Sequence, residues 1–154
     1  MNKYVRLLPL LFIFVFTACS TPPLVPPMPF GKKVKREYFT NGQVRSEFIM
    51  SDNTGQNGLL KKYGFDGKIT SVAHIKNGVR NGIETWYDKK GRVLMRVPYV
   101  NGRKHGVQEA YYPNGDIMIS YTYKNGIKDG PAVAYNKDGS VYERVVFQHG
   151  KRIN

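Results

Sequence analysis

The stretch that decides the fold runs from Trp86 to Gly106 and reads WYDKKGRVLMRVPYVNGRKHG. It contains two glycine turns with an alternating apolar run between them. The pattern recurs every 24 residues along the chain. Three series share this period: Gly67, Gly91, Gly115 and Gly139; Gly78, Gly102, Gly126 and Gly150; and Tyr63, Tyr87, Tyr111 and Tyr135. Three independent series at one period predict a repeat protein.

The repeats fill residues 34–154 and divide into the units 34–58, 59–82, 83–106, 107–130 and 131–154, with one extra residue within 51–54. In the second, third and fourth units one turn is Asn77-Gly78, Asn101-Gly102 or Asn125-Gly126, and His149-Gly150 fills the same place in the last unit. These pairs predict type I′ turns, because both central residues need positive φ. The other turn is marked by Asn41-Gly42, Asp66-Gly67, Asn114-Gly115 and Asp138-Gly139, with Lys90-Gly91 as the weak member. We interpret its Asn and Asp residues as tolerating left-handed geometry.

Between the turns the apolar side chains alternate with a period of two, which is the pattern of a β-strand. The fold class predicted is all-β: about five 24-residue β-hairpins forming a single antiparallel meander sheet that twists and curls. We expect one face to carry the whole core. Its expected members are the series of Val93, Val97 and Tyr99, the series Leu59, Ile83, Val107 and Pro131, and the tyrosine series. Basic residues at both ends, among them Arg36 and Arg144, are expected to discourage edge pairing.

The blocks Asn77–Gly82, Asn101–Gly106 and Asn125–Gly130 share the pattern Asn-Gly-x-x-x-Gly, and each unit also carries Tyr-x-x-x-Gly or a close variant. This pattern resembles the bacterial MORN-repeat variant of YwqK-type proteins over about residues 34–154. The resemblance implies a MORN-like sheet that serves as a non-catalytic scaffold for protein or membrane-lipid contact. YwqK-type proteins are often labelled antitoxin components, and in an exported chain this implies an immunity protein.

Residues 1–18 have Lys3 and Arg6 before an apolar run that is short for a membrane span, which predicts a signal peptide. The sequence Thr17-Ala18-Cys19-Ser20 resembles a lipobox, although Phe16 departs from the usual leucine. The resemblance implies that Cys19, the sole cysteine, is lipidated. Residues 19–33 then form a proline-rich tether. Ser20 resembles the pattern of lipoproteins sent to the outer membrane, facing the periplasm, in a two-membrane cell. An ordinary signal peptide or an anchor helix is the alternative.

The net charge of +13 favours anionic partners. Cations gather beside the Asn-Gly turns and predict a positive ridge of Arg80, Arg103, Lys104, Lys128, Lys151 and Arg152. The ridge is either a solvated rim or a docking strip for an acidic protein, anionic lipid or envelope glycan. Nucleic acid is disfavoured, because the tyrosines are expected in the core rather than free for base stacking and the chain is expected to be exported.

No catalytic residues, cofactor or metal site are predicted. The three histidines, His74, His105 and His149, fall at different repeat positions, whereas metal ligands come in short-range pairs. The function predicted is therefore a non-catalytic, membrane-anchored envelope lipoprotein whose repeats bind an unidentified protein partner. The alternatives are an immunity or antitoxin-like protein and a protein that binds anionic lipid or envelope polymer.

Overall fold

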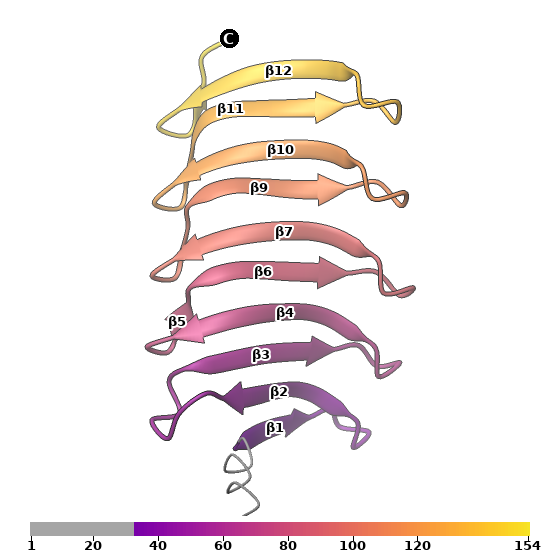
Figure 1. Ribbon diagram of the computed structural model, residues 1–154, viewed down its shortest axis with the longest axis vertical. Coiled ribbons are helices and arrows are strands. Elements are labelled where there is room, and N and C mark those ends of the chain that lie inside the picture. The colour runs from indigo at the N-terminus through magenta and orange to yellow at the C-terminus, as the bar shows by residue number, and fades with distance from the viewer. Residues whose placement is uncertain (1–32) are drawn as a thin grey trace, which may run out of the picture. The chain divides into compact units, whose positions relative to one another are not determined.

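A computed structural model describes residues 33–154, which form one antiparallel sheet without a helix (Figure 1). Cys19, the expected signal peptide and almost all of the expected tether lie outside the described residues. The strands are β1 (Val34–Tyr38), β2 (Val44–Met50), β3 (Gly58–Tyr63), β4 (Ile69–Lys76), β5 (Val79–Arg80), β6 (Gly82–Tyr87), β7 (Val93–Val100), β8 (Arg103–Lys104), β9 (Gly106–Tyr111), β10 (Ile117–Lys124), β11 (Ile127–Tyr135), β12 (Val141–Gln148) and β13 (Lys151–Arg152).

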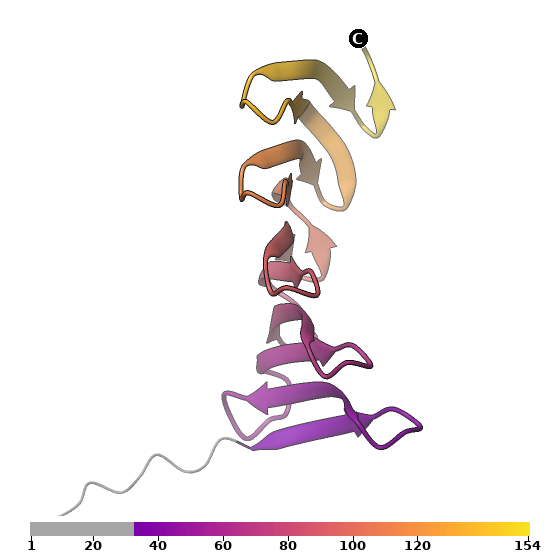
Figure 2. The same cartoon turned by 90° about the vertical axis from the view of Figure 1, so that its right-hand side faces the viewer.

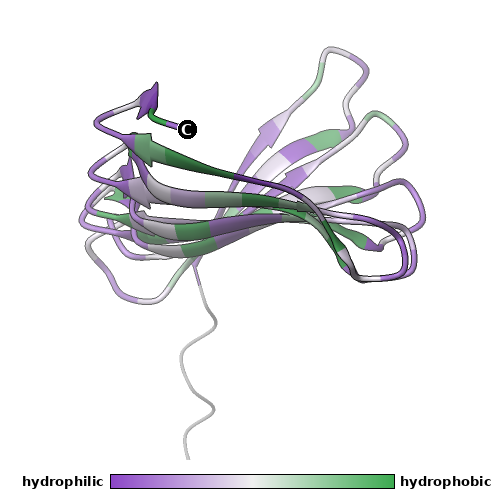
Figure 3. Cartoon of the chain, turned by 90° about the horizontal axis from the view of Figure 1, so that it is seen from above, coloured by the Kyte–Doolittle hydropathy of each residue, from purple (hydrophilic) through white to green (hydrophobic). Residues whose placement is uncertain are grey.

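Neighbouring strands follow one another in sequence, in the order β1-β2-β3-β4-β6-β7-β9-β10-β11-β12-β13. The short β5 pairs with β4, and β8 pairs with β7. The sheet twists along its length, as the view in Figure 2 shows, and its strands are bent from one margin to the other (Figure 3). The predicted all-β meander of hairpins is therefore confirmed.

The Asn-Gly turns have the predicted type I′ geometry. Asn101 and Gly102 have φ values of 48° and 80°, and the copies at residues 77, 125 and 149 are also left-handed. These turns also join successive units. The Gly102 N–H donates to the Arg80 carbonyl at 2.8 Å, and the Gly126 N–H donates to the Lys104 carbonyl at 2.7 Å. The glycine series Gly78, Gly102, Gly126 and Gly150 thus forms a backbone ladder along one margin.

In the other turn of each unit, only the glycine has positive φ. The prediction that the Asn and Asp residues of these turns are left-handed is therefore wrong. Instead, these side chains accept a hydrogen bond from the N–H two residues later. Asp138 Oδ1 accepts from the Ser140 N–H at 2.9 Å, and Asn41 Oδ1 accepts from the Gln43 N–H at 3.1 Å. This bond satisfies a turn N–H without a left-handed residue.

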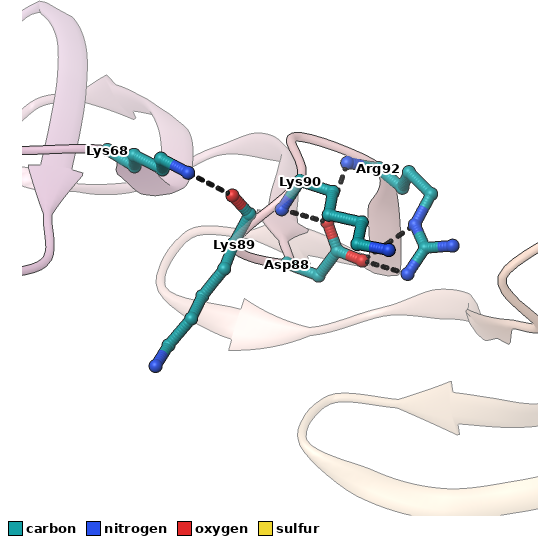
Figure 4. A network of polar contacts seen from close by, with 5 residues as sticks. All are labelled: Lys68, Asp88, Lys89, Lys90 and Arg92. Carbon is teal, nitrogen blue, oxygen red and sulfur yellow. Dashed lines mark hydrogen bonds and ion pairs between the residues drawn. The ribbon is translucent and has the colours of Figure 1, made fainter. Parts of the chain in front are cut away.

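The third unit has Lys90 where the others have Asn or Asp, and Asp88 supplies the missing acceptor (Figure 4). Asp88 Oδ1 accepts from the N–H groups of Lys90 and Arg92 at 2.8 and 2.9 Å. The Arg92 guanidinium lies 2.6 Å from Asp88 Oδ2. In the same region the Lys68 ammonium donates to the Lys89 carbonyl at 2.8 Å, which ties this turn to the one before it.

The apolar residues are divided between the two faces of the sheet. Register pairs Val97 with Glu84 and Pro98 with Ile83, and directly paired side chains share a face. We call one side the Val97 face. Outside β2, the buried residues on this face are Ser71, Ala73, Glu84, Val97, Ala132 and Val145. The other side is the Tyr face. It carries Ile83, Val107 and Pro131, so the expectation that this series shares the core with Val97 is wrong.

One extra residue per hairpin causes this division. Trp86 pairs with Met95 but Tyr87 pairs with Val93, which leaves Leu94 as a β-bulge. The bulge reverses the alternation in the second strand, so Val93 points to the same side as Tyr87. The same shift occurs at Arg45, Thr70, Met118 and Tyr142. The tyrosine series therefore lies on the Tyr face, against expectation, while Ala73, Val97 and Val145 are buried as predicted.

Candidate functional site

The structure places the six cations of the predicted ridge on two different faces. Arg80 pairs with Ile75, Lys104 with Tyr99, and Arg152 with Phe147, so these cations lie on the Val97 face. Lys128 pairs with Tyr123 and lies there too. Arg103 pairs with Val100 and Lys151 with Gln148, which places both on the Tyr face. A single continuous ridge is therefore wrong, because neighbouring residues of a strand project to opposite sides.

The predicted ridge cations that lie on the Val97 face are engaged by the chain itself. The Lys128 ammonium lies 3.8 Å from the centroid of the Tyr121 ring, and the Lys104 ammonium lies 4.9 Å from that of Tyr123. Lys104 also donates to Gln108 Oε1 at 2.8 Å, and Arg152 pairs with Glu143 at 3.1 Å. Cations over aromatic rings are attracted by the ring quadrupole. This row therefore helps to cover the apolar face rather than standing free for a ligand.

Arg80 covers the most buried charge in the described chain. Glu84 is 2% exposed, and its Oε2 lies 3.0 Å from Arg80 Nε. The Arg80 guanidinium also lies 5.5 Å from the Tyr99 ring centroid. Equivalent positions in other units hold Leu60, Gln108 and Ala132, so the repeat does not require a carboxylate here. The pair was not predicted, because the expected place of Ile83 in the core implies that its neighbour Glu84 faces solvent, whereas Glu84 pairs with Val97.

The Tyr face carries an exposed stripe along the margin of the Asn-Gly turns. We call it the aliphatic–cationic stripe, and its members are Val79, Ile83, Val100, Val107 and Ile127 with Lys76, Arg103, Lys124 and Lys151. The aliphatic side chains are 41% to 51% exposed. Within residues 33–154, none of the four cations forms an ion pair. Exposed apolar residues in a continuous row are typical of an interaction surface.

The Tyr face also contains a polar network at its first hairpins. The Tyr63 hydroxyl donates to Glu47 Oε2 at 2.6 Å, and the Arg36 guanidinium contacts Glu47 Oε1 at 2.7 Å. Burial, followed by the hydrogen bond to Glu47, raises the pKa of Tyr63 to about 12. The hydrogen bonds from Tyr63 and Arg36 lower the pKa of Glu47. These shifts come from a satisfied structural network and need no catalytic role.

A groove of about 600 Å³ lies at the N-terminal end of the sheet. Phe48, Leu60 and Ile75 supply apolar walls, and Lys35 and Lys62 also line it. Gln56 occupies the place of the later cations, because its carbonyl accepts from the Gly78 N–H as Arg80 does from Gly102. This groove could not be predicted, because it depends on which face of the sheet Leu60 occupies.

Within residues 33–154, no cluster of His, Asp and Glu side chains is arranged to hold a metal ion. The His74 ring packs over Gly82, and His149 occupies the first central position of a type I′ turn. His105 Nδ1 lies 3.5 Å from the Asn125 backbone N–H. The described part of the chain also contains no helix long and apolar enough to cross a membrane.

Two segments of the chain, residues 80–101 and 104–125, match the family model described as MORN repeat variant. Both matches begin at a cation of the Val97 face, Arg80 or Lys104, and run through the following hairpin. A search of curated proteins finds no match. MORN repeats are generally interaction repeats that contact proteins or membranes. The chain is accordingly a β-hairpin repeat protein with two recognisable MORN-variant repeats.

Proposed function

We propose that this chain is a non-catalytic envelope protein, anchored in a membrane through lipidated Cys19, whose repeat sheet binds a protein partner. The observation that carries the proposal is the aliphatic–cationic stripe. Its half-exposed aliphatic residues offer apolar area for burial, and its unpaired cations offer charge for an acidic rim on the partner. The match to interaction repeats supports the same reading.

The stripe can be tested with two substitutions in the same strand. Val100 is 48% exposed and belongs to the stripe, whereas Leu94 is 47% exposed and sits at the bulge near the opposite margin. In crosslinking and pull-down from envelope extracts with the full chain, Val100→Glu should lose a stoichiometric partner and Leu94→Glu should keep it. Equal capture of the partner by both variants would contradict a role for the aliphatic–cationic stripe in binding.

The identity of the captured partner separates a scaffold from an immunity or antitoxin-like protein. For the immunity function, the partner is a toxin, and deletion of this chain kills cells only when that toxin is present. For a scaffold, deletion disperses a complex without such a lethal effect.

The unpaired cations also support a second candidate, binding to anionic lipid or an envelope polymer. Such binding needs no protein partner and weakens as salt rises, because ions screen exposed charges. Vesicles with and without anionic lipid, titrated with salt, measure it directly.

The proposed anchor has its own test. Cys19→Ala should release the processed chain from membranes on fractionation. Membrane retention of the processed Cys19→Ala chain would contradict lipid anchoring and leave the binding surface untouched.

A further inference from the structure

Both ends of the sheet present a strand edge with no neighbour in the described chain. The strand order begins at β1, and β13 covers only Phe147 and Gln148 of β12. Beyond them, the Ile153 N–H donates to the Val146 carbonyl at 3.0 Å, and Asn154 Oδ1 accepts from the Val146 N–H. On the side of β12 that faces away from β11, the backbone before Val146, including Arg144, has no strand beside it within residues 33–154. Such an edge is a template for another strand.

The repeat dictates where an added strand would sit. At the internal junctions, Val72 pairs with Thr85, Arg96 with Glu109, and Ser120 with Val133. Arg144 is the next member of the series Val72, Arg96 and Ser120, at the same 24-residue spacing. On the other edge, Arg36 pairs with Glu47 as Lys61 pairs with Val72, so Arg36 is the counterpart of Thr85 and Glu109.

A second copy that continued the sheet would therefore place Arg36 opposite Arg144. The next pair in the same register would be Glu37 opposite Glu143. Both pairs carry like charges. No internal junction does so: Glu47–Lys61 and Arg96–Glu109 have opposite charges, and Ser71–Trp86 and Met95–Ala110 have at most one polar member. Like charges directly opposite one another across two strands are destabilising.

We propose that these charges prevent copies of the chain from stacking head to tail into a continuous sheet. Stacking of copies is a risk because of the repeat itself. The outer edges of β1 and β12 match the two strands that pair wherever one unit meets the next within the molecule. Such a contact does not close on itself and would grow into a filament. The strand that these charges keep from pairing with the outer edge of β12 is therefore β1 of a second copy in the repeat register.

The double variant Glu37→Lys/Arg144→Glu turns both junction pairs into opposite charges. It leaves the Arg36–Glu47 and Glu143–Arg152 ion pairs intact. The matched control, Glu37→Asp/Arg144→Lys, keeps both like-charge pairs. Sedimentation velocity of the full chain in mild detergent, over a wide range of protein concentration, reports the assembly state.

We expect the native chain and the control to sediment as one species at every concentration. The double variant should form a series of larger oligomers whose size increases with protein concentration and which dissociate in high salt. Its self-association constant should be at least about tenfold higher than that of the native chain. A single species for the double variant, or a series of larger oligomers for the native chain, would overturn the proposal. Arg144→Glu alone, at an exposed side chain with no ion pair in residues 33–154, repeats the test if Glu37→Lys impairs folding.

Discussion

Glu84 offers the sharpest test of how the Val97 face is held together. The carboxylate is almost fully buried and pairs with Arg80, whose own side chain is 36% exposed. In Glu84→Ala, one buried methylene is lost, worth about 0.8 kcal/mol. The ion pair with Arg80 is also lost, in which Arg80 Nε lies 3.0 Å from Glu84 Oε2 without hydrogen-bond geometry. Because Arg80 reaches water, its guanidinium can be rehydrated, so the expected loss of unfolding free energy is about 2 kcal/mol rather than the 3–5 of a fully buried pair.

Glu84→Leu should behave differently. Leucine occupies the equivalent position at Leu60, so the local backbone accommodates it. The substitution removes the cost of burying a carboxylate and adds apolar contact, which compensates for the lost pair. We expect the unfolding free energy of this variant to lie within about 1 kcal/mol of the native value.

Urea unfolding followed by the fluorescence of Trp86, the sole tryptophan, measures both variants. Glu143→Ala is the control, because its pair with Arg152 has a similar distance of 3.1 Å but both side chains are at least half exposed. It should cost no more than about 1 kcal/mol. A loss of unfolding free energy in Glu84→Ala no larger than that in Glu143→Ala would contradict the role of the buried pair, as would a larger loss in Glu84→Leu than in Glu84→Ala.

Three further predictions concern the turns and the polar network. The hydrogen bond from the Arg92 N–H is the main cause that lowers the pKa of Asp88. The stability that the ionised Asp88 carboxylate contributes is therefore complete above the ordinary Asp pKa of about 3.9 and is lost as pH falls through the folded value. Acid unfolding curves of Asp88→Asn should lack this loss. The pKa of Tyr63 is raised to about 12, so the stability that its protonated hydroxyl contributes is complete below the ordinary value of about 10 and is lost as pH rises toward 12; alkaline unfolding curves of Tyr63→Phe should lack this loss. Gly58→Ala should lower the unfolding free energy by about 1–3 kcal/mol, because the added methyl would collide with the Ile49 carbonyl; an unchanged urea midpoint would contradict that close approach.

The turns were predictable because their chemistry is local. Asn101 and Gly102 must both be left-handed in a type I′ turn, and that requirement is visible in two adjacent residues. The 24-residue period then fixes how many hairpins follow one another. Buried positions in the middle of the second strand, such as Val97, followed correctly from alternation.

The assignment of faces could not be predicted, because a single bulge residue reverses the alternation. Leu94 gives no distinguishing signal, since it is apolar like its neighbours Val93 and Met95. Without the bulge, Val93 and Val97 fall on one face; with it, Val93 joins Tyr87 on the other. The division of the predicted cationic ridge has a simpler cause. Arg103 and Lys104 are adjacent in a strand, so only one of them can join each face.

The free cations of the Tyr face and the engaged cations of the Val97 face are expected to serve different purposes, binding and stability, and a pair of double variants compares them. Arg103→Gln/Lys151→Gln and Lys104→Gln/Lys128→Gln each remove two positive charges, so the net charge of the two variants is equal. Partner capture should fall in the first variant, at unchanged stability, and persist in the second, at reduced stability. Loss of capture in the second variant with retention in the first would contradict this expectation.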